Sequence, residues 1–179
     1  MRTAFSASAA LLLAFFLQAP ARGLESTAPA AATVSSPAVR NAKTRLEIRT
    51  PAGTRHVLWL KRDATVSATA RPTAVEVIGE VKGAAVVLVD TYPSLPGGMS
   101  YCQAGEERFL RVVSILKNPP RETFRVKVAS CRDNIELAAP GIEWLPGAAT
   151  LRLRWLPGAA PKGLAEERTL VIGRDGKPG

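Results

Sequence analysis

The chain has few of the residues on which most catalytic and metal sites depend. Its 179 residues include two cysteines, one histidine and only 6% aromatic residues. The single histidine, His56, and the two cysteines cannot complete a four-ligand zinc site without carboxylates. No serine-elbow, zinc-protease or phosphate-loop motif occurs. The sequence therefore predicts no catalytic residues, no metal site and no cofactor.

Long apolar runs are also absent, apart from one near the N-terminus. The segment Ala9–Leu17 is apolar, follows the basic Arg2 and precedes small residues at 19–21. It is shorter than the roughly 20 residues that span a bilayer, and its layout is typical of a secretory signal. We expect residues 1–21 to be a signal peptide, with an uncleaved anchor helix as the alternative. The mature protein is then periplasmic or secreted and has no membrane span.

Acidic residues are outnumbered by basic ones. Lysine and arginine total 24 against 15 acidic residues, a net charge of +9. Such a surface attracts anionic polymers, although it can also serve solubility alone. The scarcity of aromatic residues and the lack of a known nucleic-acid-binding motif argue against nucleic acid as a partner. The expected partner is a protein or an anionic envelope polymer.

Large apolar side chains are scarce between residues 22 and 43, where alanine, proline, serine and threonine dominate. Such a segment buries too little surface to offset its ordering entropy, so it is predicted to be a flexible linker. Residues 44–173 have the size of one domain, and residues 174–179 form a polar tail that we expect to be disordered.

Alternation of apolar and charged residues is the dominant pattern in that domain. It occurs in Arg45–Arg49, Phe124–Val128 and Leu151–Trp155, and it is typical of half-buried strands. The run Ala84–Val89 is apolar throughout, as expected of a strand buried on both faces. The sequence predicts a monomeric all-β domain, either one antiparallel β-sandwich or a small β-barrel of about eight strands.

The two cysteines are placed by a predicted hairpin. If Lys117–Pro120 is its loop, Cys131 lies opposite Glu106 at the open end, and a bend at Gly105 brings Cys102 close. A disulfide between Cys102 and Cys131 is then geometrically possible and suits an exported protein. The alternatives are two free thiols or a pair of metal ligands.

Two surfaces are candidate binding sites. The first is the long loop that enters Cys102, because long loops in compact domains are often functional. Its proposed anchors are Tyr92, Met99 and Tyr101; alternatively, its aromatic residues cap one end of the fold. The second is a basic strand face, formed by Arg125, Lys127, Arg152 and Arg154.

These observations favour an exported, non-catalytic binding protein, such as an inhibitor or immunity-type partner of a cell-envelope hydrolase. The alternative is an envelope module that binds anionic glycan or lipopolysaccharide through the basic strand face. A third hypothesis, a small hydrolase, would use paired carboxylates. The available doublets, Glu106-Glu107 and Glu166-Glu167, are adjacent, so in a strand their side chains point to opposite faces.

Overall fold

The described part of the chain is built from strands. A computed structural model describes residues 31–40, 43–61, 63–67, 69–95 and 105–179. The strands are β1 (Thr33–Arg40), β2 (Lys43–Arg49), β3 (Arg55–Lys61), β4 (Ala74–Val81), β5 (Ala85–Pro93), β6 (Glu106–Ser114), β7 (Arg121–Ser130), β8 (Leu137–Leu145), β9 (Thr150–Trp155) and β10 (Glu167–Val171). One 3-10 turn, η2 (Pro146–Ala148), joins β8 to β9. Within these residues, no helix has the length and hydrophobicity that crossing a membrane requires.

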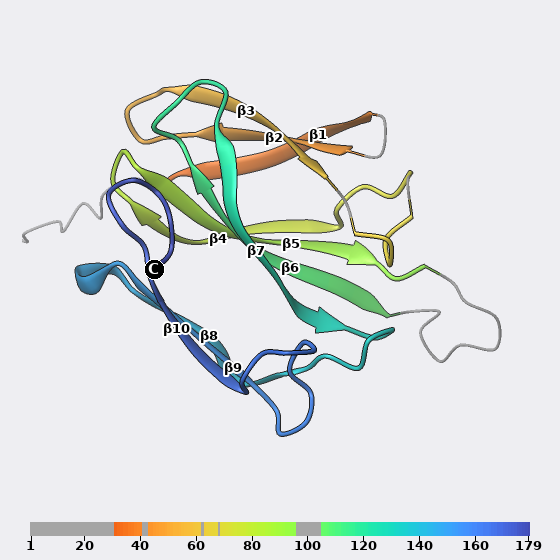
Figure 1. Cartoon of the computed structure of the whole chain (residues 1–179). Coiled ribbons are helices and arrows are strands. Elements are labelled where there is room, and N and C mark those ends of the chain that lie inside the picture. Colours follow the sequence, from red (N-terminus) through yellow and green to blue (C-terminus); the bar gives the residue numbers. More distant parts are fainter. Residues whose placement is uncertain (1–30, 41–42, 62, 68, 96–104) are drawn as a thin grey trace, which may run out of the picture.

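The strands form three antiparallel sheets. Their orders are β1-β2-β3, β4-β5-β6-β7 and β10-β9-β8. Figure 1 shows the four-stranded sheet in the middle, with one three-stranded sheet on either side. The prediction of an all-β fold is confirmed. The expected sandwich or barrel of about eight strands differs from this arrangement of three sheets, and the described residues contain no closed barrel.

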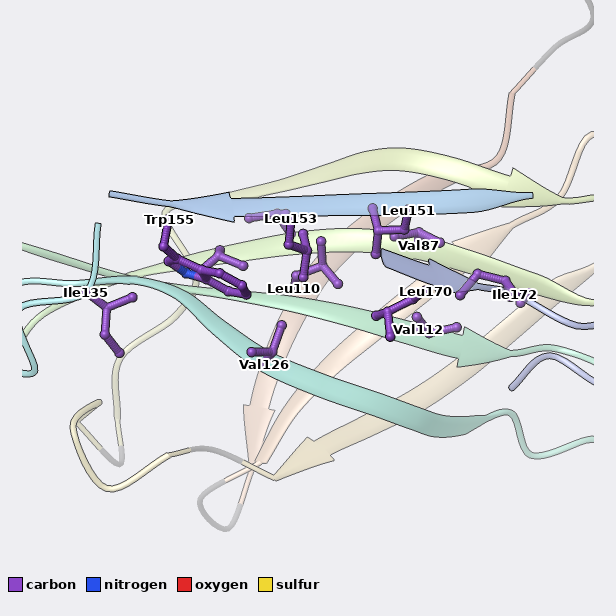
Figure 2. Packing of buried hydrophobic residues seen from close by; sticks show 13 residues of the cluster. Val87, Leu110, Val112, Val126, Ile135, Leu151, Leu153, Trp155, Leu170 and Ile172 are labelled. Atoms are coloured by element: carbon purple, nitrogen blue, oxygen red, sulfur yellow. The ribbon is translucent and has the colours of Figure 1, made fainter. Parts of the chain in front are cut away.

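The first hydrophobic core lies between the middle sheet and the sheet β10-β9-β8. It unites Val87, Leu110 and Val126 of the middle sheet with Leu151 and Leu153 of β9. Figure 2 shows these side chains pointing toward one another from the two sheets. Because alternate residues of a strand share a face, the sequence pattern of β9 directly produces this packing.

The second core lies on the opposite face of the middle sheet. Val86 and Leu88 of β5 pack there against Leu46, Ile48 and Leu60 of the sheet β1-β2-β3. Strand β5 therefore contributes neighbouring residues to different cores. This explains its uninterrupted apolar sequence, and the prediction of a strand buried on both faces is confirmed.

Two strands, β1 and β8, are not predicted by alternation of apolar and charged residues. The segment Thr33–Arg40 lies in the predicted linker, yet it pairs with β2 as an edge strand. Its register shifts between Ser35 and Ala38, around Pro37, and edge positions with such irregularities tolerate proline. Strand β8 contains Pro140, and its pairing with β9 shifts between Leu137 and Ile142.

The C-terminal segment is held in place, contrary to the expectation of a disordered tail. Thr123 donates a hydrogen bond of 2.7 Å to the carbonyl of Gly176, and Gly179 donates one of 3.0 Å to Val171. Gly176 is buried and fits against Ser114 with no room for a Cβ atom. Backbone contacts order this segment, and composition alone does not reveal them.

The predicted hairpin is present as β6 and β7. At its open end Glu107 pairs with Ser130, and Cys131 donates a 3.3 Å hydrogen bond to the carbonyl of Glu106. The expected opposition of Cys131 and Glu106 is thus confirmed. Two irregularities nearer the loop then shift the register.

Candidate functional site

Tyr92, the first proposed anchor of the predicted recognition loop, lies in the protein interior. Tyr92 is 1% exposed, and its ring packs edge-on against Phe109 with the ring centroids 6.1 Å apart. Val66 belongs to the same small cluster. In this structure Tyr92 stabilises the fold and cannot be a solvent-facing anchor. Met99 and Tyr101 lie outside the described residues.

Lys127, predicted to bind a polyanion, already has its counter-ions within the chain. Its side chain is 11% exposed and lies among three carboxylates, those of Asp63, Glu107 and Asp133. Its ammonium also donates a 3.0 Å hydrogen bond to Thr65. Burial alone would lower the pKa of Lys127, but the carboxylates outweigh burial and raise this pKa above its ordinary value. Lys127 is therefore an internal ion-pair partner.

The other three predicted basic residues do not form one surface, because Arg125 lies apart from Arg152 and Arg154. Arg152 and Arg154 alternate with the β9 residues that face the first core, so they lie on the outer face of their sheet. Arg125 pairs in register with Arg111, which points away from that core. The first core and two sheets therefore separate Arg125 from the β9 arginines, and the predicted basic strand face does not form.

The acidic doublet at the start of β6 is divided between two faces, as expected. Glu106 is exposed, whereas Glu107 is fully buried. The Glu107 carboxylate accepts a 2.7 Å hydrogen bond from the Ser94 hydroxyl and lies 3.5 Å from the Lys127 ammonium. These two carboxyl groups therefore do not face a common substrate.

The cysteine pair can be followed only in part, because Cys102 lies outside the described residues. Gly105 closely approaches Cys131: a Cβ atom on Gly105 would lie 2.6 Å from the Cys131 Cβ and 2.9 Å from its Sγ. Gly105 also accepts a 2.9 Å hydrogen bond from the Ser94 amide. The chain therefore passes beside the Cys131 sulfur only three residues after Cys102.

Among the residues that the structure describes, an exposed cationic cluster lies on the outer face of the sheet β1-β2-β3. Three arginines surround one carboxylate there, and we call Arg45, Glu47, Arg49 and Arg55 the arginine cluster. Arg55 donates a 2.7 Å hydrogen bond to Glu47, and Arg49 lies 2.9 Å from the other carboxylate oxygen. Arg45 is more distant, at 3.9 Å.

Strand register produces this cluster. Arg45, Glu47 and Arg49 alternate with Leu46 and Ile48, which point into the second core. The register places Arg49 directly opposite Arg55, so the two guanidinium-bearing residues meet at the same end of the sheet.

The cluster holds its carboxylate ionised and keeps its cations accessible. The hydrogen bond from Arg55, with a smaller contribution from Arg49, lowers the pKa of Glu47 against the opposing effect of burial. Glu47 is 8% exposed, while the side chains of Arg49 and Arg55 are 67% and 52% exposed. The buried Glu47 carboxylate thus holds the guanidinium groups of Arg49 and Arg55 in position, and the cluster retains a net positive charge.

An exposed aromatic residue lies beside the cluster. Trp59 is 39% exposed and stands directly opposite Arg45 in the β2–β3 register. An indole next to guanidinium groups offers an apolar surface that can contact a sugar ring or a lipid headgroup. The alternation of Arg45, Glu47 and Arg49 was visible in the sequence. Its convergence with Arg55 was not, because that depends on the register of the next strand.

Comparison with known proteins gives no relative for this chain. No protein-family model matches it, and neither a curated protein nor a solved structure does.

Proposed function

We propose that the chain is an exported, monomeric, non-catalytic binding protein that holds phosphate-bearing envelope glycan or lipopolysaccharide on the arginine cluster. The observation that supports this proposal is the pair of exposed guanidinium groups, Arg49 and Arg55, fixed side by side by the buried Glu47. The planar fork of donors on arginine matches phosphate oxygens in a bidentate geometry. Fixing the side chains in advance lowers the entropic cost of binding.

The proposal is tested with the mature protein and immobilised lipopolysaccharide at two salt concentrations. The double variant Arg49→Gln/Arg55→Gln should bind about tenfold more weakly or worse, since each of the two exposed contacts is worth up to about 1 kcal/mol and a tenfold change corresponds to about 1.4 kcal/mol. Wild-type binding should weaken as salt rises, because exposed charges are screened.

The matched control is Arg152→Gln/Arg154→Gln, which removes the same charge from the outer face of β9. It should bind like the wild type. If both double variants lose affinity equally, binding depends on net charge alone and the proposed site is wrong.

The Cys102–Cys131 disulfide is part of the same proposal, because export exposes the thiols to an oxidising compartment. Its support is the position of Gly105 against the Cys131 sulfur. A thiol count under denaturing, non-reducing conditions should find no free thiol. Two free thiols would contradict the disulfide. They would also contradict the stabilisation of roughly 3–4 kcal/mol that the disulfide would supply.

The inhibitor hypothesis is the second proposal and now rests on Met99 and Tyr101 alone, since Tyr92 is buried. It predicts salt-insensitive binding to an envelope hydrolase that the variant Tyr101→Ala abolishes. The arginine-cluster variants should leave that binding unchanged.

A further inference from the structure

A groove of about 870 Å³ opens at one end of the molecule. Its walls come from the β2–β3 turn, the β4–β5 turn and the β8–η2 junction. Figure 1 shows these turns gathered at the same end. Its lining among the described residues includes Pro51, Ala52, Ile115, Trp144 and Pro146. Ligand pockets of about 300–1,000 Å³ with mostly apolar walls are typical of small-molecule and lipid sites.

The apolar wall of the groove is packed closely against the rest of the fold. Trp144 lies flat against Gly79 of β4, where a Cβ atom would approach the indole to less than 3.0 Å. Ile115 is 6% exposed and belongs to the second core. Glu80, also in the lining, accepts a 3.2 Å hydrogen bond from the Ala32 amide. The groove is thus a preformed feature of the packing between elements.

The β2–β3 turn connects the arginine cluster, on the outer face of its sheet, with this groove, which lies on the side of the second core. Arg49 ends β2, Arg55 begins β3, and only residues 50–54 separate them. Four of those residues, Thr50, Pro51, Ala52 and Thr54, line the groove. One short turn therefore carries exposed cations at its base and four groove-lining residues, of which Pro51 and Ala52 are apolar.

We infer that the anion bound by the arginine cluster is the headgroup of a phospholipid-like amphiphile, whose acyl chain lies in the adjacent groove. This inference rests on the proposed function and narrows its ligand class. The headgroup phosphate lies against Arg49 and Arg55, and the chain follows the β2–β3 turn to Ile115 and Trp144. Charge complementarity selects the headgroup, and the apolar walls select the chain.

The test uses three soluble probes and isothermal titration of the mature protein. Dihexanoyl phosphatidylglycerol, kept below its micelle concentration, carries both parts of the proposed ligand. Glycerol 3-phosphate lacks the chains, and dihexanoyl phosphatidylcholine lacks the net negative charge. The phosphatidylglycerol should bind at least tenfold more tightly than either of the other probes.

Filling the groove separates this inference from the proposed function. Ala52→Trp places a bulky, uncharged side chain at an exposed turn position and should reduce phosphatidylglycerol affinity about tenfold. Ala165→Trp, at an exposed position distant in sequence from every groove residue, should leave it unchanged. Both variants should keep glycerol 3-phosphate binding.

Equal affinity for phosphatidylglycerol and glycerol 3-phosphate would overturn the lipid inference while leaving lipopolysaccharide binding by the arginine cluster intact. Equal affinity for the two lipids would overturn it as well, because the headgroup would then play no part. If wild-type protein binds neither lipopolysaccharide nor any anionic probe, the proposed function itself fails.

Discussion

Arg111 is a fully buried cation whose ion-pair partners come from neighbouring strands. Its Nε donates a 2.7 Å hydrogen bond to Asp90, its Nη1 bonds Glu122, and its guanidinium lies 5.4 Å from the centroid of the Phe109 ring. Burial opposes its charge, but Asp90 and then Glu122 outweigh burial and raise the pKa of Arg111. We predict that Arg111→Met costs about 3–5 kcal/mol in urea unfolding, because the Asp90 carboxylate is left buried and unpaired.

The double variant Asp90→Leu/Arg111→Met is the control for that prediction. It removes both charges, so it should be clearly more stable than Arg111→Met alone. If the single variant loses less than about 1 kcal/mol, which is the value of an exposed ion pair, the burial argument is wrong.

The stabilisation that Lys127 contributes should depend on pH. Because its folded-state pKa is raised, its ion pairs stabilise the fold at neutral pH, and this contribution is lost as pH rises through that raised pKa. Lys127→Met should therefore be less stable than wild type at pH 8, and the gap between their unfolding free energies should narrow as pH rises through the raised pKa of Lys127. A gap that stays constant would show that the loss comes from packing and not from charge.

At the scale of elements, alternation of apolar and charged residues predicts β2, β7 and β9, and a continuous apolar run predicts β5, whereas β1 and β8 are not predicted by either pattern. Both exceptions contain proline and a register irregularity, and their composition gives no alternating signal. The hairpin β6–β7 could be predicted down to its open-end register. The ion pairs of Arg111 could not be predicted. The alternation in β6 places Arg111 on the correct face, but it does not show that Asp90 and Glu122 lie beside it.

The same limit explains the errors in the candidate site. Sequence places Arg125 and Arg152 on strands, but the side of the molecule that each faces depends on how the sheets stack. Arg49 and Arg55 converge only because β2 and β3 pair in one particular register. Which basic residues are free and which are internal counter-ions is therefore decided by tertiary contacts.

Strand β4 has one position where only glycine fits. At Gly79 a Cβ atom would meet the Trp144 indole at less than 3.0 Å, so Gly79→Ala should displace that ring and cost about 1–3 kcal/mol. Gly147→Ala is the control, since no heavy atom lies within 4 Å of its added Cβ. Thermal unfolding followed by circular dichroism gives both values. Equal stability of the two variants would show that Trp144 can move away without loss.

At the scale of the whole molecule, the middle sheet links the two cores. Val87 and Leu110 face one core, while Val86 and Leu88 face the other. Removing the sheet β1-β2-β3 would expose apolar side chains on both sides of the second core. Partial unfolding that leaves half the molecule intact is therefore costly, and we expect a single cooperative transition.

Amide hydrogen exchange of a core variant tests this cooperativity. Leu60→Ala, in the second core, should cost about 2–5 kcal/mol. If unfolding is global, exchange should accelerate by the same factor, about 30-fold or more, at Ile48 beside the mutation and at Leu153 in the other core. Leu116→Ala makes the same substitution at a half-exposed leucine and should change neither rate appreciably. Faster exchange at Ile48 alone would mean that the sheet β1-β2-β3 opens independently, and the arginine cluster would then lie on a separately mobile layer.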